Sequence, residues 1–211
     1  MSAIELDSLP LCETAETQPV FPFRPSSMLD YSETALYANA FSSDDMGRVL
    51  DLAAAIVPEE ATLGSRRNVD MSIRRSLVRW IRVNAENVWL FEKVTALISE
   101  ANISRYGFDL SGLYEPLQVA EYSEGAFFRW HKDHGSGPHA IRKLSLTVQL
   151  SDPGDYEGGE MEFLHSPEVE AAPKERGTAI IFPAYVMHRV RPITRGLRRS
   201  LVAWVSGPPF R

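Results

Sequence analysis

The second half of the chain, from about residue 116, consists of short apolar runs separated by Gly, Pro, Asp and Ser. Each run has the length of a strand, and residues 152–159 form a pronounced turn between two of them. Seven short strands joined by turns predict an antiparallel sandwich or barrel rather than parallel βαβ units. The runs span residues 117–122, 126–131, 144–150, 160–164, 178–182, 186–190 and 198–205.

The preceding stretch shows helical spacing of its apolar positions. Ser42 or Ser43 can cap a first helix, whose apolar positions recur up to Val57, before Pro58. A second helix follows, with Asn84 as its predicted cap and an apolar face on residues 91, 94, 97, 98 and 101. Residues 76–83 between them are rich in strand formers. Helices followed by strands predict an α+β fold that is mainly β, with N-terminal helices backing one sheet.

The chain divides into an irregular N-terminal segment, residues 1–38, and a single domain, residues 39–211. Prolines punctuate the first segment, and Phe21–Phe23 either docks on a sheet edge, covers a pocket or belongs to a disordered tail. A length of 211 residues, with 44% hydrophobic and 24% charged positions, fits one globular domain with a sizeable core. These features leave the oligomeric state open.

Charge and cysteine content narrow the class of protein. A formal net charge of −6 and a pI of about 5.4 argue against a nucleic-acid partner. Cys12 is the single cysteine, so no internal disulfide or cysteine-based zinc site can form, which suits a reducing cytoplasm. The N-terminus lacks the pattern of a signal peptide, and no run of about 18 apolar residues occurs. We therefore expect a cytoplasmic protein without a membrane span.

Two histidines and an aspartate form the first candidate site. His131 and Asp133 share one face of a predicted strand, and His188 follows a second strand and a turn. Two imidazoles and one carboxylate with open coordination positions are the facial triad of non-haem Fe(II) oxygenases. Zinc accepts the same donors. His134 and His139, in the adjacent loop, are the alternative ligands if the strand register differs.

An arginine favours iron over zinc, because it would bind a dicarboxylate co-substrate. Arg198 lies ten residues after His188 and shares a strand face with Ser200. A guanidinium with a hydroxyl two residues away can hold a carboxylate bidentately with one further hydrogen bond. The alternative is a solvated basic cluster of Arg195, Arg198 and Arg199. A buried binding pocket around Arg198 is favoured over a solvated cluster, because its neighbours on the same strand face, Ser200 and Val202, are of types expected in the interior.

Three sequence blocks resemble the prolyl-4-hydroxylase-like 2-oxoglutarate/Fe(II) dioxygenases, and most closely the bacterial PKHD-type hydroxylases. The blocks are Leu117-Gln118-x-x-x-Tyr122-x-x-Gly125-x-x-x-x-Trp130-His131-x-Asp133, Leu144-Ser145-x-x-x-x-Leu150-Ser151-Asp152-Pro153 through Gly158-Gly159-Glu160, and Gly177-Thr178 through His188-Arg189-Val190-x-Pro192-Ile193-Thr194-Arg195-Gly196-x-Arg198. The similarity covers roughly residues 75–207. It implies a double-stranded β-helix (jelly-roll) barrel with iron at its open end.

The resemblance also implies the roles of individual residues. His131, Asp133 and His188 match the iron ligands, and Arg198 matches the residue that pairs with the distal carboxylate of 2-oxoglutarate. Tyr122 and Gln149 match further positions that contact the co-substrate in relatives. With Arg198 and Ser200 they complete the predicted co-substrate residues. Classic prolyl hydroxylases often carry lysine at the position of Arg198. The arginine in this chain fits the PKHD branch and weakens the case for a prolyl peptide as substrate. The carboxylate of Asp133 argues against a halogenase.

The activity implied is oxidative decarboxylation of 2-oxoglutarate, with Fe(II) and O₂, coupled to hydroxylation of an unactivated C–H. The substrate is an amino-acid-like small molecule or a peptide side chain. Arg129 and Trp130 are candidate substrate contacts, together with Lys132 and the 134–140 loop. By alternation Arg129 shares the face of His131 and could bind a substrate carboxylate; the alternative is an outward arginine on the rim of the strand. The alternatives are an oxidative nucleobase demethylase, a jelly-roll binding module without turnover and, more remotely, a zinc hydrolase.

Overall fold

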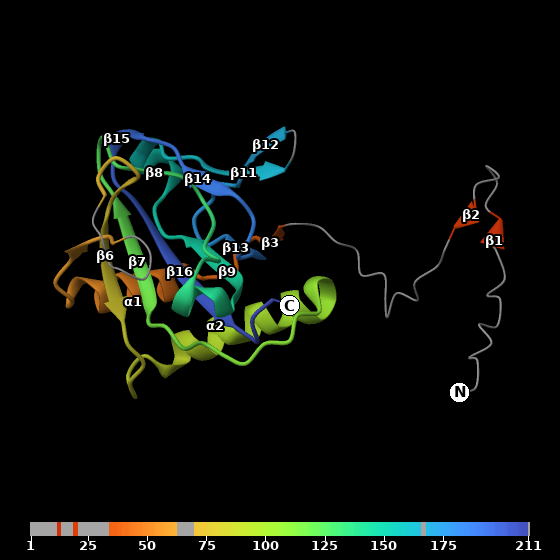
Figure 1. Ribbon diagram of the computed structural model, residues 1–211. Helices are drawn as coiled ribbons and strands as arrows, with labels where there is room; N and C mark the ends of the chain where they lie inside the picture. The colour runs from red at the N-terminus through yellow and green to blue at the C-terminus, as the bar shows by residue number, and fades with distance from the viewer. Residues whose placement is uncertain (1–11, 14–18, 21–33, 63–69, 166–167, 211) are drawn as a thin grey trace, which may run out of the picture.

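The computed structural model describes residues 12–13, 19–20, 34–62, 70–165 and 168–210, and Phe21–Phe23 lies outside them. Antiparallel sheets make up most of the described fold (Figure 1). The larger sheet has seven strands, in the order β3 (Ala35–Tyr37), β13 (Ala179–Pro183), β9 (Arg142–Gln149), β16 (Arg198–Ser206), β7 (Leu117–Tyr122), β6 (Leu77–Ile81) and β4 (Glu59–Glu60).

A smaller sheet faces the larger one. It has five strands, in the order β12 (Glu168–Ala171), β11 (Met161–His165), β14 (His188–Val190), β8 (Phe127–His131) and β5 (Arg74–Arg75). Two further antiparallel pairs are β10 (Tyr156–Gly158) with β15 (Ile193–Gly196), and β1 (Cys12–Glu13) with β2 (Pro19–Val20). Short 3-10 turns, η2 (Gly137–Ile141) and η3 (Pro153–Asp155), interrupt the connections. The two facing sheets form a double-stranded β-helix.

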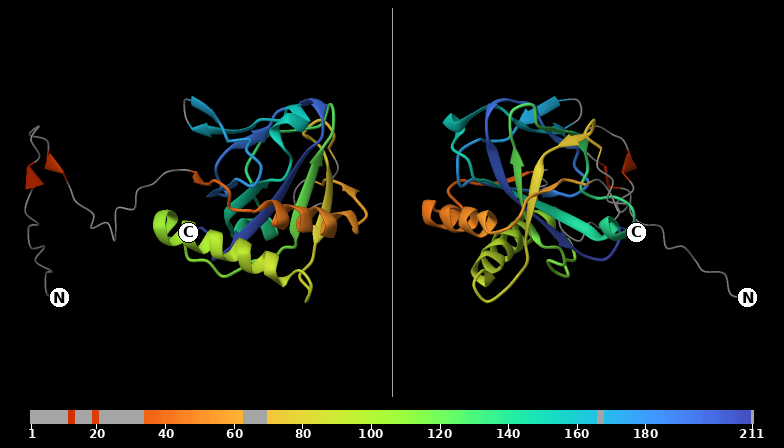
Figure 2. Two further views of the ribbon diagram at one scale, coloured as in Figure 1. Left: turned by 180° about the vertical axis from the view of Figure 1, so that it is seen from behind. Right: turned by 90° about the vertical axis from the view of Figure 1, so that its left-hand side faces the viewer.

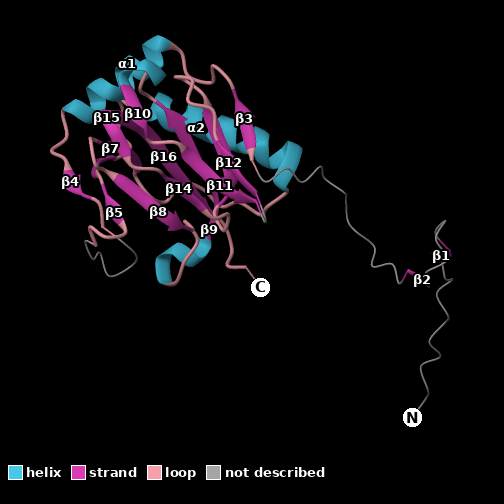
Figure 3. Cartoon of the chain, turned by 90° about the horizontal axis from the view of Figure 1, so that it is seen from above, coloured by secondary structure: helices cyan, strands magenta, loops and turns pink. Residues whose placement is uncertain are grey.

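Two helices cover the outer face of the larger sheet (Figures 2 and 3). The first, α1 (Ser43–Ala54), begins with a capping box, in which the Ser42 hydroxyl accepts from the Asp45 amide and the Asp45 carboxylate accepts from the Ser42 amide. The second, α2 (Val88–Ala101), continues into a π-helical turn, η1 (Asn102–Tyr106). The buried apolar side chains of these helices pack against the apolar side chains on the helix-facing side of the sheet. Together they form the main core, which includes Val49, Leu90, Leu146 and Leu201.

Strand alternation gives the larger sheet two faces, one that packs against the helices and one that points toward the smaller sheet. All residues of β9 are buried, because helices cover one face and the smaller sheet the other. Leu144, Leu146 and Val148 enter the core with the helices. Ser145, Thr147 and Gln149 therefore point into the space between the sheets. Polar side chains buried in that space need partners, and the candidate site supplies them.

The observed elements confirm the predicted fold class, with few helices and a strand at each of the seven predicted positions. Two details of the helices were wrong. The first helix, α1, ends at Ala54, short of Pro58, and Val57 is exposed. Asn84 does not cap α2, which begins at Val88; its side chain accepts from the Glu86 and Asn87 amides in the turn before the helix. The division at residue 38 stays a prediction, and β3 already pairs with β13 before it. No helix among the described residues is long and apolar enough to cross a membrane.

Candidate metal and co-substrate site

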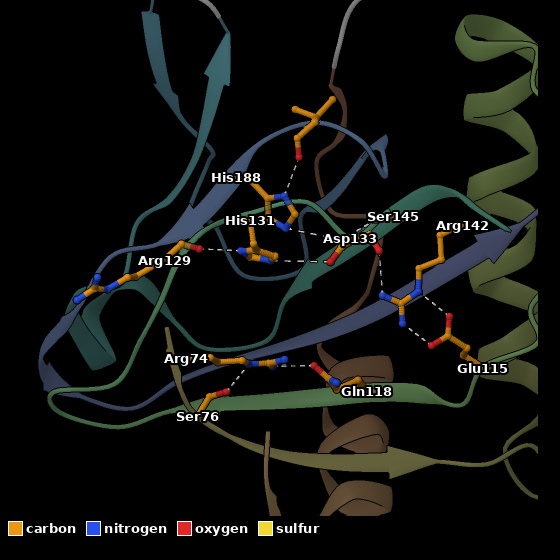
Figure 4. Close-up of polar contacts among 11 residues, drawn as sticks. Arg74, Ser76, Glu115, Gln118, Arg129, His131, Asp133, Arg142, Ser145 and His188 are labelled. Carbon is orange, nitrogen blue, oxygen red and sulfur yellow. Dashed lines mark hydrogen bonds and ion pairs between the residues drawn. The ribbon is translucent and has the colours of Figure 1, made fainter. Parts of the chain in front are cut away.

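His131, Asp133 and His188 converge at one end of the smaller sheet (Figure 4). His131 ends β8 and His188 begins β14, and the two residues are direct partners in the antiparallel pairing. One donor atom from each of the three residues lies within 4.8 Å of the others. The Nε2 atoms of His131 and His188 lie 3.8 and 3.6 Å from the two Asp133 carboxylate oxygens. A single cation at the centre of this group can meet all three.

Hydrogen bonds outside the cluster fix the orientation of its members. The Nδ1 atoms of His131 and His188 lie 2.8 and 3.0 Å from the main-chain carbonyl oxygens of Arg129 and Val186. A carbonyl accepts only from a protonated Nδ1, so each Nε2 keeps its lone pair for the centre of the cluster. Such outer partners hold metal-binding imidazoles in a productive tautomer.

The protonation states of the cluster suit a metal ion. Burial, and then the charge of His188, lowers the pKa of His131 to about 3. Burial works against ionisation of Asp133, but the charges of His188 and His131 outweigh it and lower the pKa of the carboxyl to about 2. Ser145 adds a hydrogen bond of 2.7 Å from its hydroxyl to Asp133 Oδ2. Near neutral pH, therefore, a neutral imidazole and an ionised carboxylate are ready to bind metal without losing protons.

A cavity of about 620 Å³ between the two sheets is lined by the cluster and by three of the four predicted co-substrate residues; Gln149 is not among its lining residues. The side chains of Tyr122, Arg198 and Ser200 line it together with the two histidines and the aspartate. Arg198 is only 1% exposed, and its guanidinium lies 5.6 Å from the Tyr122 ring centroid. The candidate metal-binding and carboxylate-binding groups thus share one cavity.

Arg198 is held by one neutral partner and has donors to spare. Its Nη2 donates to Gln149 Oε1 at 2.9 Å. Among the described residues, its buried Nε and Nη1 have no hydrogen-bond partner. Unpaired buried guanidinium donors are costly, and a carboxylate would satisfy two of them at once. The geometry therefore fits a carboxylate beside Arg198, while Gln149 orients the guanidinium from the adjacent strand β9.

Two predicted substrate contacts, Arg129 and Trp130, lie outside the cavity lining. Between β8 and β14, His188 pairs with His131 but Val190 pairs with Phe128, so β8 carries an extra residue. This bulge breaks the alternation that the prediction assumed. Phe128 and His131 both face inward, with ring centroids 3.4 Å apart, whereas Arg129 is exposed and points away from the cluster (Figure 4). The predicted placement of Arg129 on the face of His131 is wrong.

The alternative ligands from the adjacent loop are not part of the cluster. His134 packs against Phe210, with ring centroids 5.3 Å apart. His139 lines the cavity, as do Lys132 and several residues of the loop. The loop therefore borders the cavity without contributing a donor atom to the metal-binding group.

Several residues around the site were missed in the sequence. Ser145 lies on the inward face of β9, and its signal was a polar residue between Leu144 and Leu146. Arg142 donates to both carboxylate oxygens of Glu115 and to the Asp133 carbonyl, which fixes the chain beside the cluster. Arg74 lines the cavity from β5, a strand of two residues that no periodicity could have indicated.

Comparisons with known proteins agree with this geometry. Residues 117–206 match the model of the 2OG-Fe(II) oxygenase superfamily. The predicted resemblance is confirmed. A PKHD-type hydroxylase of Cupriavidus metallidurans is 36% identical over 103 residues, which are 46% of this chain and 45% of the relative. One of Synechococcus is 34% identical over 98 residues, 44% of each chain. The match thus spans less than half the length of these curated relatives.

Solved structures show the same fold. A prolyl-4-hydroxylase of Pseudomonas putida superposes with a TM-score of 0.67 at 20% identity, covering 83% of this chain and 93% of that one. A Trichoplax adhaerens prolyl hydroxylase, solved with a peptide fragment of the hypoxia inducible factor oxygen degradation domain, gives 0.71 at 19%, covering 83% and 84%. The family match and the His-Asp-His group together support Fe(II), 2-oxoglutarate and O₂ as metal and co-substrates.

Proposed function

We propose that this protein is an Fe(II)/2-oxoglutarate-dependent oxygenase that hydroxylates an unactivated C–H of a small molecule or peptide side chain. One observation carries the proposal: a buried arginine with unpaired donors shares a cavity with a convergent His-Asp-His group. A zinc site needs no such arginine. A binding module without turnover could use both features, and succinate formation separates it from an oxygenase.

Each residue has a defined task in this proposal. His131, Asp133 and His188 hold Fe(II) on one face, and Fe(II) with 2-oxoglutarate supplies the activation of O₂. Arg198 binds the distal carboxylate of the co-substrate through its free donors. Gln149 keeps the guanidinium in position, and the Ser200 hydroxyl and the Tyr122 ring border the same space.

The size of the cavity and the ligand of one structural neighbour support the proposed substrate class. About 620 Å³ accommodates the co-substrate with an amino-acid-like molecule or one peptide side chain beside it. The Trichoplax relative was solved with a peptide, which supports the peptide alternative. The net charge of −6 does not favour a nucleobase in a nucleic acid. A cytoplasmic site of action stays part of the proposal.

The decisive experiment is anaerobic addition of Fe(II), then 2-oxoglutarate, to the metal-free protein, with a visible spectrum after each addition. The parent should develop the charge-transfer band of the Fe(II)·2-oxoglutarate chelate. Asp133→Ala should lose the band because metal binding fails. Arg198→Ala should require a much higher 2-oxoglutarate concentration. Arg195→Ala is the matched control, because that side chain is 64% exposed and pairs with Glu157.

Succinate release under air then separates an oxygenase from a binding protein. Succinate should form slowly without substrate and faster when a substrate is added. Iron binding without a band would refute 2-oxoglutarate as co-substrate. A band without any succinate would favour the binding module, and hydrolysis with zinc in the absence of oxygen would favour the hydrolase.

A further inference from the structure

A second buried arginine, Arg74, lines the cavity and is not used by the proposed chemistry. It is 7% exposed and lies on β5, the edge strand beside β8. Its Nε donates to the Ser76 hydroxyl at 2.8 Å and its Nη2 to Gln118 Oε1 at 2.9 Å (Figure 4). Its guanidinium lies 4.6 Å from the Phe128 ring centroid. All of these partners are neutral.

Arg74 shares this property with Arg198, which the proposed function assigns to the co-substrate, and differs in it from the remaining arginine and lysine side chains of the cavity wall. Arg142 is neutralised by Glu115, to which it donates from two nitrogens. Lys132 and Arg82 are exposed, so water solvates their charges. Within the described residues, no carboxylate forms an ion pair with Arg74, and its side-chain hydrogen bonds, from Nε and Nη2, go to the neutral Ser76 and Gln118. Burying a guanidinium without a counter-charge is costly, so the position calls for an anion.

The charges of the proposed complex leave room for one further anion. Asp133 faces the metal ion, and Arg198 faces the distal carboxylate of 2-oxoglutarate. Arg74 lies beside the other side of the cluster, where Phe128 stacks on both Arg74 and His131. It is therefore near the metal-binding group, and its contacts are with Ser76, Gln118 and Phe128 rather than with the co-substrate residues Arg198, Tyr122 and Ser200.

A second unsatisfied donor lies in the same part of the cavity. Trp204 is 6% exposed, and its Nε1 has no hydrogen-bond partner among the described residues. Gln118, the partner of Arg74, pairs across the sheet with Trp80 and Val202. The ring centroids of Trp80 and Trp204 are 6.2 Å apart. This end of the cavity thus combines a cation, a free N–H donor and two aromatic rings.

We propose that Arg74, held by Gln118 and Ser76, binds a carboxylate group of the substrate and orients its C–H toward the metal. This inference rests on the proposed function and narrows its substrate class to carboxylate-bearing molecules, such as an amino acid derivative or an acidic peptide. The Trp204 indole N–H donates a hydrogen bond to a second, neutral acceptor of the same substrate. Arg74 thus takes the role that the sequence had suggested for Arg129.

The test uses a panel of N-acetyl amino acids, each as the free acid and as its carboxamide. The intact protein is loaded with Mn(II) and 2-oxoglutarate, so that Arg198 is occupied and no turnover occurs. Tryptophan fluorescence reports binding, because Trp80 and Trp204 lie at the site. At least one acid should bind ten-fold or more tightly than its carboxamide. Absence of any acid preference across the panel overturns the proposal.

Two variants test Arg74 itself. Arg74→Gln should abolish the acid preference. Gln118→Glu should abolish it as well, because a carboxylate placed at the 2.9 Å contact neutralises Arg74 while leaving it in position. Arg75→Gln is the matched control, from the exposed face of the same strand, and should keep the preference. Thermal melts verify that the variants fold. Retention of the preference in folded Arg74→Gln or Gln118→Glu overturns the assignment.

Failure of the inference and failure of the proposed function give different results. Parent, Arg74→Gln and Gln118→Glu should all form the Fe(II)·2-oxoglutarate band with the same co-substrate dependence. A normal band without an acid preference refutes only the role of Arg74. An absent band in the parent refutes the proposed function, whatever the acids do.

Discussion

The hydrogen bond from Ser145 to Asp133 provides a test of how the metal-binding residues are held in position. Its side chain is fully buried, at 0% exposure, and donates a 2.7 Å hydrogen bond to Asp133 Oδ2. A Ser145→Ala change removes this donor in a place that water does not reach. A hydrogen bond to a charged group contributes about 1.5–3 kcal/mol, and loss of an outer partner typically weakens metal binding about 10–100-fold. We expect a decrease in Fe(II) affinity within that range.

The assay is anaerobic calorimetric titration of Fe(II) into the metal-free protein. Thr147→Val is the matched control, since Thr147 lies on the same inward face two residues along β9 and makes no hydrogen bond to the cluster. It should bind Fe(II) like the parent. A Ser145→Ala affinity within two-fold of the parent, or an equal loss in Thr147→Val, would refute the orienting role of the hydroxyl.

Three further changes test other parts of the structure. Gly159→Ala, at φ +64°, would place a Cβ 2.3 Å from Ile193 Cδ1 and 3.1 Å from Arg198 Cδ; it should lower the free energy of unfolding by about 1–2 kcal/mol in urea titrations and weaken 2-oxoglutarate binding. Ser42→Ala removes the α1 cap and should cost about 1 kcal/mol in the same assay, without affecting Fe(II) affinity. Burial raises the pKa of Glu121, but hydrogen bonds from two arginines outweigh it and hold the pKa below its ordinary 4.5. Its ionised form thus stabilises the fold above that pH, and Glu121→Gln should cost about 1–2 kcal/mol at pH 7. This cost should shrink as the pH falls below 4.5 and through the lowered pKa of the folded state; a constant difference would contradict this.

Alternation predicted the arrangement of the site wherever the strands are regular. The i, i+2 spacing correctly placed Arg198 and Ser200 on one inward face of β16, and both line the cavity. His131 and Asp133 also converge, although Asp133 lies just beyond the end of β8. Pairing with His188 comes from the sheet topology, which the family resemblance implied.

The failures come from features that a period of two cannot express. The bulge in β8 turns Arg129 outward, and an extra residue in one strand is visible only once its partner strand is known. Arg74 was missed because a strand of two residues has no periodicity. Its partner Gln118 is 44 positions away, so their contact depends on tertiary structure.

The loop over residues 135–141 is fixed by main-chain hydrogen bonds at both of its ends. The His134 amide donates to the Ala184 carbonyl at 2.8 Å, and the Gly207 amide donates to the Ile141 carbonyl at 2.9 Å. Between these anchors, the loop contributes Gly135, Ser136, Pro138 and His139 to the cavity wall and no donor to the metal cluster. Because these anchors lie at the ends of the loop, its length and composition can be varied to reshape the cavity wall while His131 and Asp133, which precede it, keep their positions.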